Sequence, residues 1–305
     1  MKKIFLFTIL VIFIPFILII NKELPISLKN KYGIKSNKII RVKRVNKNKI
    51  EEVPLEEYVI GVVSGEMPAS FSIEALKAQA VASRSYVLTK TVNNKKDYDV
   101  VDTTSNQVYL DDEDKKEKWK TSYDANLKKV TEAVKSTTGE VLIYNNEIVD
   151  AMFFSTSNGY TEDSVDVFNS NVPYLKSVSS KWDEIESPAF LSEVSVTKTE
   201  FLHNLGIKED YINIGNINKT NTGRVKTIKI NNKNYDASEI RKAFNLKSTS
   251  FNIEVNNDKV KFSVKGFGHG VGMSQYGANG MAKESYKYKE ILDHYYTNCK
   301  LKKLF

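Results

Sequence analysis

Two features of the chain predict an α+β fold, built from mixed helices and antiparallel hairpins and preceded by a transmembrane helix. Helix-forming runs dominate the first half, including an alanine-rich run at 73–91. Short β-prone runs flank Asn-Asn turns at 145–146, 231–232 and 256–257, and such turns join antiparallel strands. Because helices and strands do not alternate regularly, a doubly wound parallel sheet is not expected.

The composition is that of an ordinary folded protein. Of the 305 residues, 41% are hydrophobic and 27% are charged, which is enough for one large domain or two small ones. The net charge of +8 indicates an anionic partner, such as nucleic acid, anionic lipid or an acidic wall polymer. The single cysteine, Cys299, excludes an intrachain disulfide.

The first residues predict a membrane anchor. Lys2 and Lys3 precede an uncharged apolar run at 4–20, whose 17 residues are near the lower limit for a spanning helix. A cleaved signal peptide is the alternative, but no small-x-small cleavage site follows the run. We therefore expect residues 1–21 to form a cytoplasmic stub and an uncleaved single-pass anchor, with the remainder outside the cytoplasm. Nucleic acid is then not an expected partner.

The segment after the anchor is strongly basic. Residues 22–50 contain ten Lys or Arg and one acidic residue, Glu23. We interpret 22–37 as a juxtamembrane linker, which is either a solvated spacer or a contact for anionic lipid or wall polymer. A strand at 39–45 then predicts that the folded domain occupies 38–305.

The elements of this domain follow in order. The first strand returns at 50–53 and leads into a short helix that breaks at 64–68. The long helix comes next, with Ser72 as its N-cap and Glu74 in its first turn. The predicted helices are 55–63, 73–91, 123–136 and 283–296. The predicted hairpin strands are 140–144 and 147–154, and an antiparallel subregion occupies about 205–265.

Glu66 is the first candidate for chemistry. It lies in Gly65-Glu66-Met67-Pro68, at an element boundary where a carboxyl can be partly shielded from water. Shielding raises a carboxyl pKa, so that the group stays protonated and can act as the general acid of glycosidic cleavage. The alternative is a carboxylate that only caps neighbouring backbone N–H groups.

A glycine-rich segment at 266–280 contains six of the 14 glycines. Glycine permits positive φ and close backbone approach, so we expect a loop there and neither a helix nor a regular strand. The segment lacks the residues of a phosphate loop and the spacing of a dinucleotide-binding turn. It presents His269, Ser274, Gln275 and Tyr276, although a tight structural loop with a locally bonded histidine is the alternative.

Two further sets of polar residues are candidates for binding. Lys77 and Arg84 are seven residues apart on the long helix and share one face, with Glu74 placed to pair with Lys77. This face is either a solvated, salt-bridged surface or a cationic strip for a carboxylate-bearing substrate. The loop 154–162 presents hydroxyl groups and Glu162, either at a sugar site or in a plain turn.

No metal site is expected from the residues alone. The histidines, at 203, 269 and 294, are far apart, and the chain has neither His-Glu-x-x-His nor paired cysteines. The Gly-x-Ser-x-Gly turn of serine hydrolases is absent as well.

Taken together, these segments resemble the sporulation protein D domain family. Three separate motifs occur in the same order over about 38–305, which makes the resemblance specific. They comprise residues 55–68 with 74–86, residues 154–162 continuing to Pro173-Tyr174-Leu175, and residues 266–282 ending in 291–296.

The resemblance implies a peptidoglycan lytic transglycosylase with a glycan-binding cleft. Such an enzyme cleaves the MurNAc-GlcNAc bond of peptide-denuded strands and forms 1,6-anhydro-MurNAc, here during forespore engulfment in sporulation. The alternative is a non-catalytic glycan-binding scaffold of the same cell-wall machinery. The implied partners are glycan strands and stage II sporulation proteins P, an amidase, and M, a membrane scaffold. The implied location is the mother-cell membrane facing the forespore.

The resemblance also implies roles for single residues. Glu66 falls on the family's catalytic glutamate, and one glutamate can serve first as the acid and then as the base. Lys77, Arg84, Tyr174 and Lys176 fall on positions linked to activity. The expected substrate-binding residues are Lys77, Arg84, Ser155, Ser157, Tyr160, Tyr174, Lys176, His269, Ser274 and Gln275.

Zinc is the one family feature that we do not expect here. Some relatives bind zinc near the loop 154–162 through histidine and cysteine. In this chain Phe154 occupies the histidine position, and Ser155 and Ser157 leave no cysteine. Neither a metal nor another cofactor is therefore expected.

Overall fold

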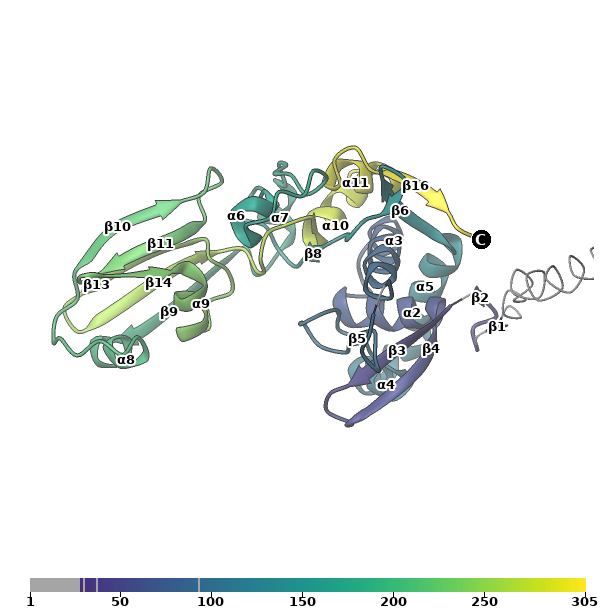
Figure 1. Cartoon of the computed structure of the whole chain (residues 1–305), viewed down its shortest axis with the longest axis horizontal. Helices are drawn as coiled ribbons and strands as arrows, with labels where there is room; N and C mark the ends of the chain where they lie inside the picture. Colours follow the sequence, from purple (N-terminus) through teal and green to yellow (C-terminus); the bar gives the residue numbers. More distant parts are fainter. Residues whose placement is uncertain (1–27, 30, 37, 93) are drawn as a thin grey trace, which may run out of the picture.

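The computed structural model describes residues 28–29, 31–36, 38–92 and 94–305. The chain forms two lobes, each with its own apolar core (Figure 1). The mixture of helices and antiparallel sheets confirms the predicted α+β class. The predicted anchor at 4–20 lies outside the described residues, and no helix in the described part is long and apolar enough to cross a membrane.

The larger lobe begins with a hairpin, as predicted. Strands β3 (Ile39–Arg44) and β4 (Lys49–Pro54) pair antiparallel, and β5 (Val100–Val101) adds a parallel edge. Alternate side chains of β3, including Ile40 and Val42, enter the core, because successive residues of a strand point to opposite faces. The short strands β1 (Leu28–Lys29) and β2 (Lys35–Ser36) pair before this hairpin.

Part of the expected linker packs against this lobe. The ammonium of Lys31 lies 2.9 Å from Glu57 and 2.6 Å from Asp112. The hydroxyl of Tyr32 donates to Asp112 at 2.8 Å, and Ile34 is buried in the core. The folded region therefore includes residues that precede the predicted start at residue 38.

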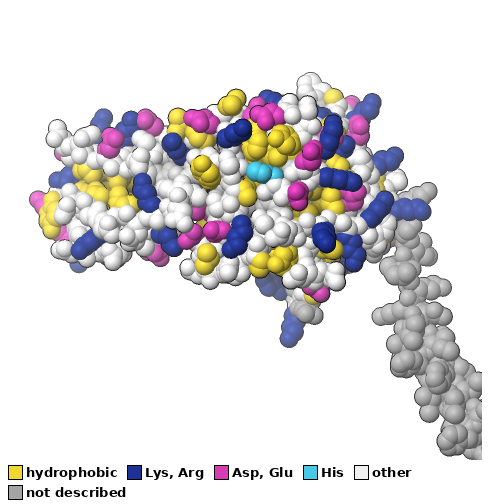
Figure 2. Space-filling model, turned by 90° about the horizontal axis from the view of Figure 1, so that it is seen from above, with side chains coloured by type: hydrophobic (Ala, Val, Ile, Leu, Met, Phe, Trp, Pro, Cys, Tyr) yellow, Lys and Arg dark blue, Asp and Glu magenta, His cyan; other side chains and the backbone are white. Residues whose placement is uncertain are grey.

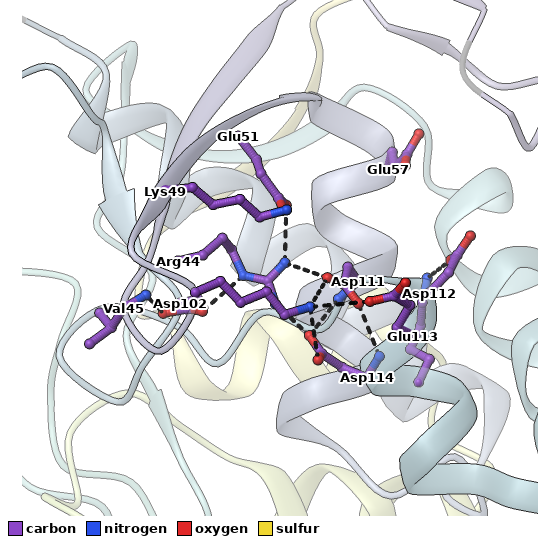
Figure 3. Close-up of polar contacts among 12 residues, drawn as sticks. Arg44, Val45, Lys49, Glu51, Glu57, Asp102, Asp111, Asp112, Glu113 and Asp114 are labelled. Carbon is purple, nitrogen blue, oxygen red and sulfur yellow. Dashed lines mark hydrogen bonds and ion pairs between the residues drawn. The ribbon is translucent and has the colours of Figure 1, made fainter.

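A buried arginine joins the hairpin to the chain before α4 (Asp112–Trp119), as Figure 3 shows. Arg44 donates to Asp102 at 2.9 Å, to Asp111 at 2.8 Å and to Glu51 at 3.0 Å, and it also pairs with Asp114. Burying a guanidinium is costly unless it is paired and hydrogen-bonded, and four carboxylates surround this one. Asp111 and Asp114 of the acidic run thus support the hairpin.

Three helices make the centre of the larger lobe: α2 (Leu55–Glu66), α3 (Ile73–Lys90) and α5 (Tyr123–Ser136). Helix α3 is buried on nearly all sides, and its alanines allow α2, α5 and later elements to approach it closely. Helix α2 is longer than predicted, since the expected break at 64–68 begins only at Met67, whose backbone is extended. A single 3-10 turn, η1 (Lys120–Ser122), separates α4 from α5.

The next hairpin is shorter than predicted. Strand β6 (Glu140–Tyr144) pairs with β7 (Glu147–Ile148) across Asn145 and Asn146, both at positive φ. The predicted return strand to Phe154 is wrong beyond Ile148. Strand β8 (Phe153–Phe154) instead pairs in parallel with β15 (Met273–Ser274), and β16 (Lys300–Lys303) completes the sheet of β6.

The smaller lobe is inserted between α7 (Trp182–Glu186) and the glycine-rich segment (Figure 1). It contains the two hairpins predicted at 231–232 and 256–257. The antiparallel subregion begins at residue 191, earlier than the predicted 205, because its first strand pairs with its last. Its elements are β9 (Leu191–Thr197), α8 (Lys198–Asn204), β10 (Ile214–Lys219), β11 (Val225–Ile230), β12 (Lys233–Asp236), α9 (Ala237–Ala243), β13 (Phe251–Asn256) and β14 (Lys259–Lys265).

Only the first half of the glycine-rich segment is a loop. Four of its glycines, at 266, 268, 270 and 272, have positive φ as expected. The expectation that no helix forms there is wrong, because α10 (Gln275–Lys283) contains Gly277 and Gly280. A Cβ on Gly277 would lie 2.1 Å from the hydroxyl of Tyr295, and one on Gly280 would lie 2.4 Å from the Cβ of Trp182. These helical glycines therefore serve close packing.

The remaining helices are short. Helix α11 (Tyr288–Tyr295) is shorter than the predicted 283–296, because α10 ends at Lys283 and a turn separates the two. Helix α6 (Ser164–Phe168) follows the polar loop at 154–162.

Gly277→Ala tests this packing. In an exposed helix, Gly→Ala stabilises by about 1 kcal/mol. Here the added methyl would overlap the Tyr295 hydroxyl, so we expect a destabilisation of about 1–3 kcal/mol in chemical denaturation. The control is Gly206→Asn, where a Cβ meets nothing within 4 Å and asparagine tolerates the φ of 62°. A stabilised Gly277→Ala protein would contradict the close packing of α10.

Candidate functional site

Glu66 is the last residue of α2, and two glycines of that helix shape its surroundings. Gly61 and Gly65 lie one turn apart, on the face covered by the segment at 107–110. A Cβ on Gly65 would lie 2.2 Å from the carbonyl oxygen of Val108. Only glycine at these positions lets the segment approach the helix so closely, and this approach brings the backbone N–H of Val108 to Glu66.

The carboxyl group of Glu66 is held by specific hydrogen bonds. The N–H of Val108 donates to its Oε1 at 2.6 Å, and the side chain of Gln275 bonds to it as well. Burial raises the pKa of Glu66, while these hydrogen bonds and the charge of Lys118 oppose the shift. The result is a partly exposed carboxyl that stays protonated to higher pH than a solvated glutamate.

One face of α3 completes this environment. Gln79, Ser83 and Tyr86 follow the i, i+4, i+7 spacing of a single face. Gln275 donates to Gln79 at 3.5 Å, and Gln79 donates to Ser83 at 2.9 Å. The negative charge of Glu66 contributes to the raised pKa of Tyr86. This polar face was not predicted from the sequence, although the i, i+4, i+7 spacing of Gln79, Ser83 and Tyr86 was a usable signal.

The parallel pair of β8 and β15 brings the second and third motifs together. Met273 lies opposite Phe153, and Ser274 lies opposite Phe154. The carbonyl of Ser155 accepts from the N–H of Tyr276 at 3.1 Å. Ser155 and Gln275 therefore lie on neighbouring backbones, and Ser155 remains partly exposed, consistent with a place at the edge of the Glu66 site.

A buried carboxylate, Asp183, joins the loop at 154–162 to the glycine-rich segment through hydrogen bonds. It accepts from the hydroxyls of Ser157 at 2.8 Å, Ser180 at 2.6 Å and Ser274 at 2.6 Å, and from the N–H of Ser157 at 3.1 Å. Burial raises the pKa of Asp183, against the effect of these donors. Asp183 could not be identified from the sequence, because no motif marks it.

Two expected substrate contacts are therefore wrong. Ser157 and Ser274 are fully buried, and their hydroxyls are used by Asp183. Ser274 also accepts from the N–H of Gly277 at 3.3 Å and so caps α10. Both serines support the loops from inside.

The predicted cationic strip on α3 does not face Glu66. At about 100° per residue, Lys77 and Arg84 lie roughly half a turn from Gln79 and Tyr86. Lys77 is partly exposed and pairs with Glu74 at 2.8 Å, as predicted.

Arg84 is fully buried, which contradicts its expected contact with substrate. Its guanidinium donates to both carboxylate oxygens of Glu56, at 2.9 and 2.6 Å, and to the carbonyl of Glu140 at 2.9 Å. Glu56 is also fully buried. This bidentate pair joins α2, α3 and β6, so the role of Arg84 is structural.

His269 is bonded within its own loop. Its Nε2 donates to the carbonyl of Phe153 at 3.1 Å, and its Nδ1 accepts from the N–H of Val271 at 3.1 Å. Burial lowers the pKa of His269 to about 4, so the ring is neutral near pH 7. These contacts fit the structural alternative for this residue.

Glu162 belongs to the junction between the lobes. It accepts from the hydroxyl of Thr222, and its Oε1 lies 3.3 Å from Nε of Arg224. The guanidinium of Arg224 also donates to the carbonyl of Gly268 at 3.0 Å. Burial raises the pKa of Glu162 to about 7 and lowers that of Arg224 to about 10. The pair thus connects the smaller lobe to two parts of the larger lobe, the loop at 154–162 and the glycine-rich segment.

Three other predicted residues remain accessible. Tyr160 is 52% exposed, and Lys176 is partly exposed, with its ammonium 2.8 Å from Asn171. Tyr174 is partly buried against Tyr144, and its hydroxyl accepts from the N–H of Asp150 at 3.1 Å. Substrate contact by these residues stays a prediction.

The residues around Phe154 do not form the histidine–cysteine zinc site that was considered from the family resemblance. The buried Phe154 packs against His269, whose ring nitrogens are both engaged in the local bonds described above. Within the described ranges, no three His, Cys, Asp or Glu side chains are grouped so as to hold a metal ion. The absence of zinc stays a prediction.

Surface charge on this molecule is mixed. On the face in Figure 2, basic and acidic side chains are interspersed, without one continuous basic field.

The cation whose charge acts on Glu66 is Lys118, on α4. Sequence reasoning missed it, because only the fold brings α4 to the end of α2.

Comparisons with known proteins agree with this arrangement. A family model described as Stage II sporulation protein matches residues 43–144, which contain Glu66 and α3. Stage II sporulation protein D of Bacillus subtilis (strain 168) is 45% identical over 269 residues, covering 86% of this chain and 78% of the relative. The protein of the same name from Bacillus amyloliquefaciens is 43% identical, covering 84% and 76%. The Amidase enhancer of B. subtilis is 33% identical, covering 79% and 40%.

The structural role of Arg84 can be tested by unfolding. Arg84→Met leaves Glu56 buried without its partner, so we expect a loss of about 3–5 kcal/mol in chemical denaturation. Adding Glu56→Leu removes the orphaned charge and should restore most of this stability. If Arg84→Met is as stable as the wild type, the ion pair does not support the fold.

Proposed function

This chain belongs to the stage II sporulation protein D family and has a role in sporulation, and from this premise we propose that it is a peptidoglycan lytic transglycosylase. Its substrate is the MurNAc-GlcNAc bond of glycan strands whose stem peptides have been removed. Its product carries a 1,6-anhydro-MurNAc end. The observation that carries the proposal is the carboxyl of Glu66, which is shielded and hydrogen-bonded at the meeting point of α2, α3 and α10.

In the first step Glu66 acts as the general acid. Its raised pKa keeps Glu66 protonated to higher pH than an ordinary glutamate, and the proton goes to the glycosidic oxygen as the bond to C1 of MurNAc breaks. The GlcNAc side leaves as an alcohol, and positive charge develops at C1 and the ring oxygen. The N–H of Val108 and the side chain of Gln275 hold the carboxyl in place for this transfer.

In the second step the same residue acts as the base. The carboxylate accepts the proton of the C6 hydroxyl, whose oxygen bonds to C1 and closes the anhydro ring. One proton leaves Glu66 and one returns, so the enzyme is regenerated without water. A single carboxyl suffices for this sequence, because no water molecule has to be activated by a second one.

The proposed cellular setting rests on the family resemblance. We propose a single-pass anchor at 4–20, with the two lobes outside the cytoplasm at the mother-cell membrane facing the forespore. Stage II sporulation proteins P and M are the proposed partners in engulfment. An amidase such as protein P would supply the peptide-denuded strands.

Glu66→Gln tests the proposal. The amide occupies nearly the same space but cannot transfer the proton, so anhydro-product release should fall at least 100-fold, while glycan binding persists. The measurement is product release by wild type and variant on denuded and intact peptidoglycan, with folding checked by circular dichroism. Equal release by the two folded proteins would remove Glu66 from the mechanism. No release even by the wild type would favour the non-catalytic scaffold.

The pH dependence provides a second test. Cleavage begins with protonated Glu66, so kcat/KM should fall as pH rises through its pKa, which lies above the ordinary value for glutamate. Below that pKa, the protonated form is already predominant and the rate should level off. A pH–rate profile of the wild type with a decline at the ordinary glutamate pKa would contradict the assignment.

A further inference from the structure

Lys118 reaches from α4 to the end of the helix that carries Glu66. Its ammonium donates to the carbonyl of Ser64 at 2.8 Å and to the carbonyl of Gly65 at 3.1 Å. These are among the last carbonyls of α2, which have no partner within the helix. The chain turns away at Met67, whose N–H bonds to the carbonyl of Val63. Lys118 therefore ties down the backbone on the N-terminal side of Glu66.

The electrostatic position of Glu66 makes this cation important. The C-terminal end of a helix carries partial negative charge, which disfavours a carboxylate there. Burial disfavours ionisation as well, and Lys118 is the charged side chain that opposes both effects. Burial lowers the pKa of Lys118, while the charge of Glu66 raises it, so the two groups are coupled.

Other charged or titratable groups surround the pair. On the helices packed around Glu66 they are the phenols of Tyr58 and Tyr86, whose pKa values are raised by burial and by the charge of Glu66. A cavity of about 520 Å³ beside Lys118 is lined by Val108, which bonds Glu66, and by charged residues of the first hairpin, of α4 and of the segment after β5. Those charged residues are Arg44, Lys47, Asp102, Asp114 and Glu117.

Most of these neighbours are already paired. Arg44 and Lys47 bind the carboxylates of Asp111 and Asp114, and Asp102 binds Arg44. The ammonium of Lys118 is bonded instead to the backbone of α2. Its charge thus remains available to Glu66.

We propose that Lys118 is a positioning residue for Glu66, which fixes the last turn of α2 through two backbone carbonyls and adds a positive charge that favours the carboxylate form. Its effect on activity rests on the proposed function, since only a catalytic Glu66 needs both protonation states. Its effect on the geometry and ionisation of Glu66 does not depend on that function. In the two-step reaction, Lys118 favours the carboxylate that must accept the C6 proton.

The test replaces Lys118 in the full chain, solubilised in detergent. Lys118→Met removes the charge and both hydrogen bonds, whereas Lys118→Arg keeps a cation. Lys116→Met is the matched control, because Lys116 lies on the same helix, is exposed, and faces Tyr123 rather than α2. Circular dichroism and thermal unfolding establish that each variant is folded.

The first readout is the ionisation of Glu66 itself. Carbodiimide labels protonated carboxyls, and peptide mass spectrometry follows labelling of Glu66 against pH. With Lys118→Met the midpoint should move to higher pH, because an opposite charge nearby has been lost. Lys118→Arg and Lys116→Met should label as the wild type does. An unchanged midpoint in folded Lys118→Met would overturn the proposal.

The second readout is cleavage of denuded glycan. Lys118→Met should lower kcat about tenfold or more, with little change in KM, and should move the decline of the pH–rate profile to higher pH. A rise in KM alone would refute a positioning role and indicate a substrate contact. If the labelling midpoint shifts but the wild type cleaves nothing, the link between Lys118 and Glu66 stands and the proposed function fails.

Discussion

The carboxylate of Asp183 is the interaction on which the arrangement of the site depends. It binds Ser157 of one loop, Ser274 at the start of α10, and Ser180 between them, and Ser180 in turn bonds the hydroxyl of Tyr295. A buried carboxylate must have its lone pairs satisfied, so these segments can pack only when all of their donors converge. The convergence places Gln275, the residue after Ser274, beside Glu66.

Close backbone approach is the second constraint on the site. Gly61 and Gly65 allow the segment at 107–110 to pack closely against α2. Gly277 and Gly280 allow α7 and α11 to pack closely against α10. In each case a methyl group would overlap a neighbouring atom, so the glycines determine how near the functional side chains come. Glu66 thus receives its hydrogen bonds from groups that are far away in the sequence.

The buried arginines of the chain and its more exposed lysines have different roles. Arg84 is enclosed with Glu56, Arg44 with four carboxylates, and Arg224 with Glu162 at the junction of the lobes. Each of these guanidiniums has a structural role, because a buried cation is tolerated only when it is paired. Lysines such as Lys118 and Lys176 keep their ammonium groups near the surface, where they can act on Glu66 or on a ligand.

The sequence by itself determined the α+β class, the hairpins with their Asn-Asn turns and the long helix, and it marked Glu66 as a candidate at an element boundary, since local patterns and motif spacing carry these properties. It could not show that Arg84, Ser157 and Ser274 face inward, nor that half of the glycine-rich segment is helical. It also could not reveal Val108, Gln79, Lys118 or Asp183 as neighbours in the site. Burial and pairing between distant segments decide which side chains are consumed by the fold, and only the tertiary structure contains that information.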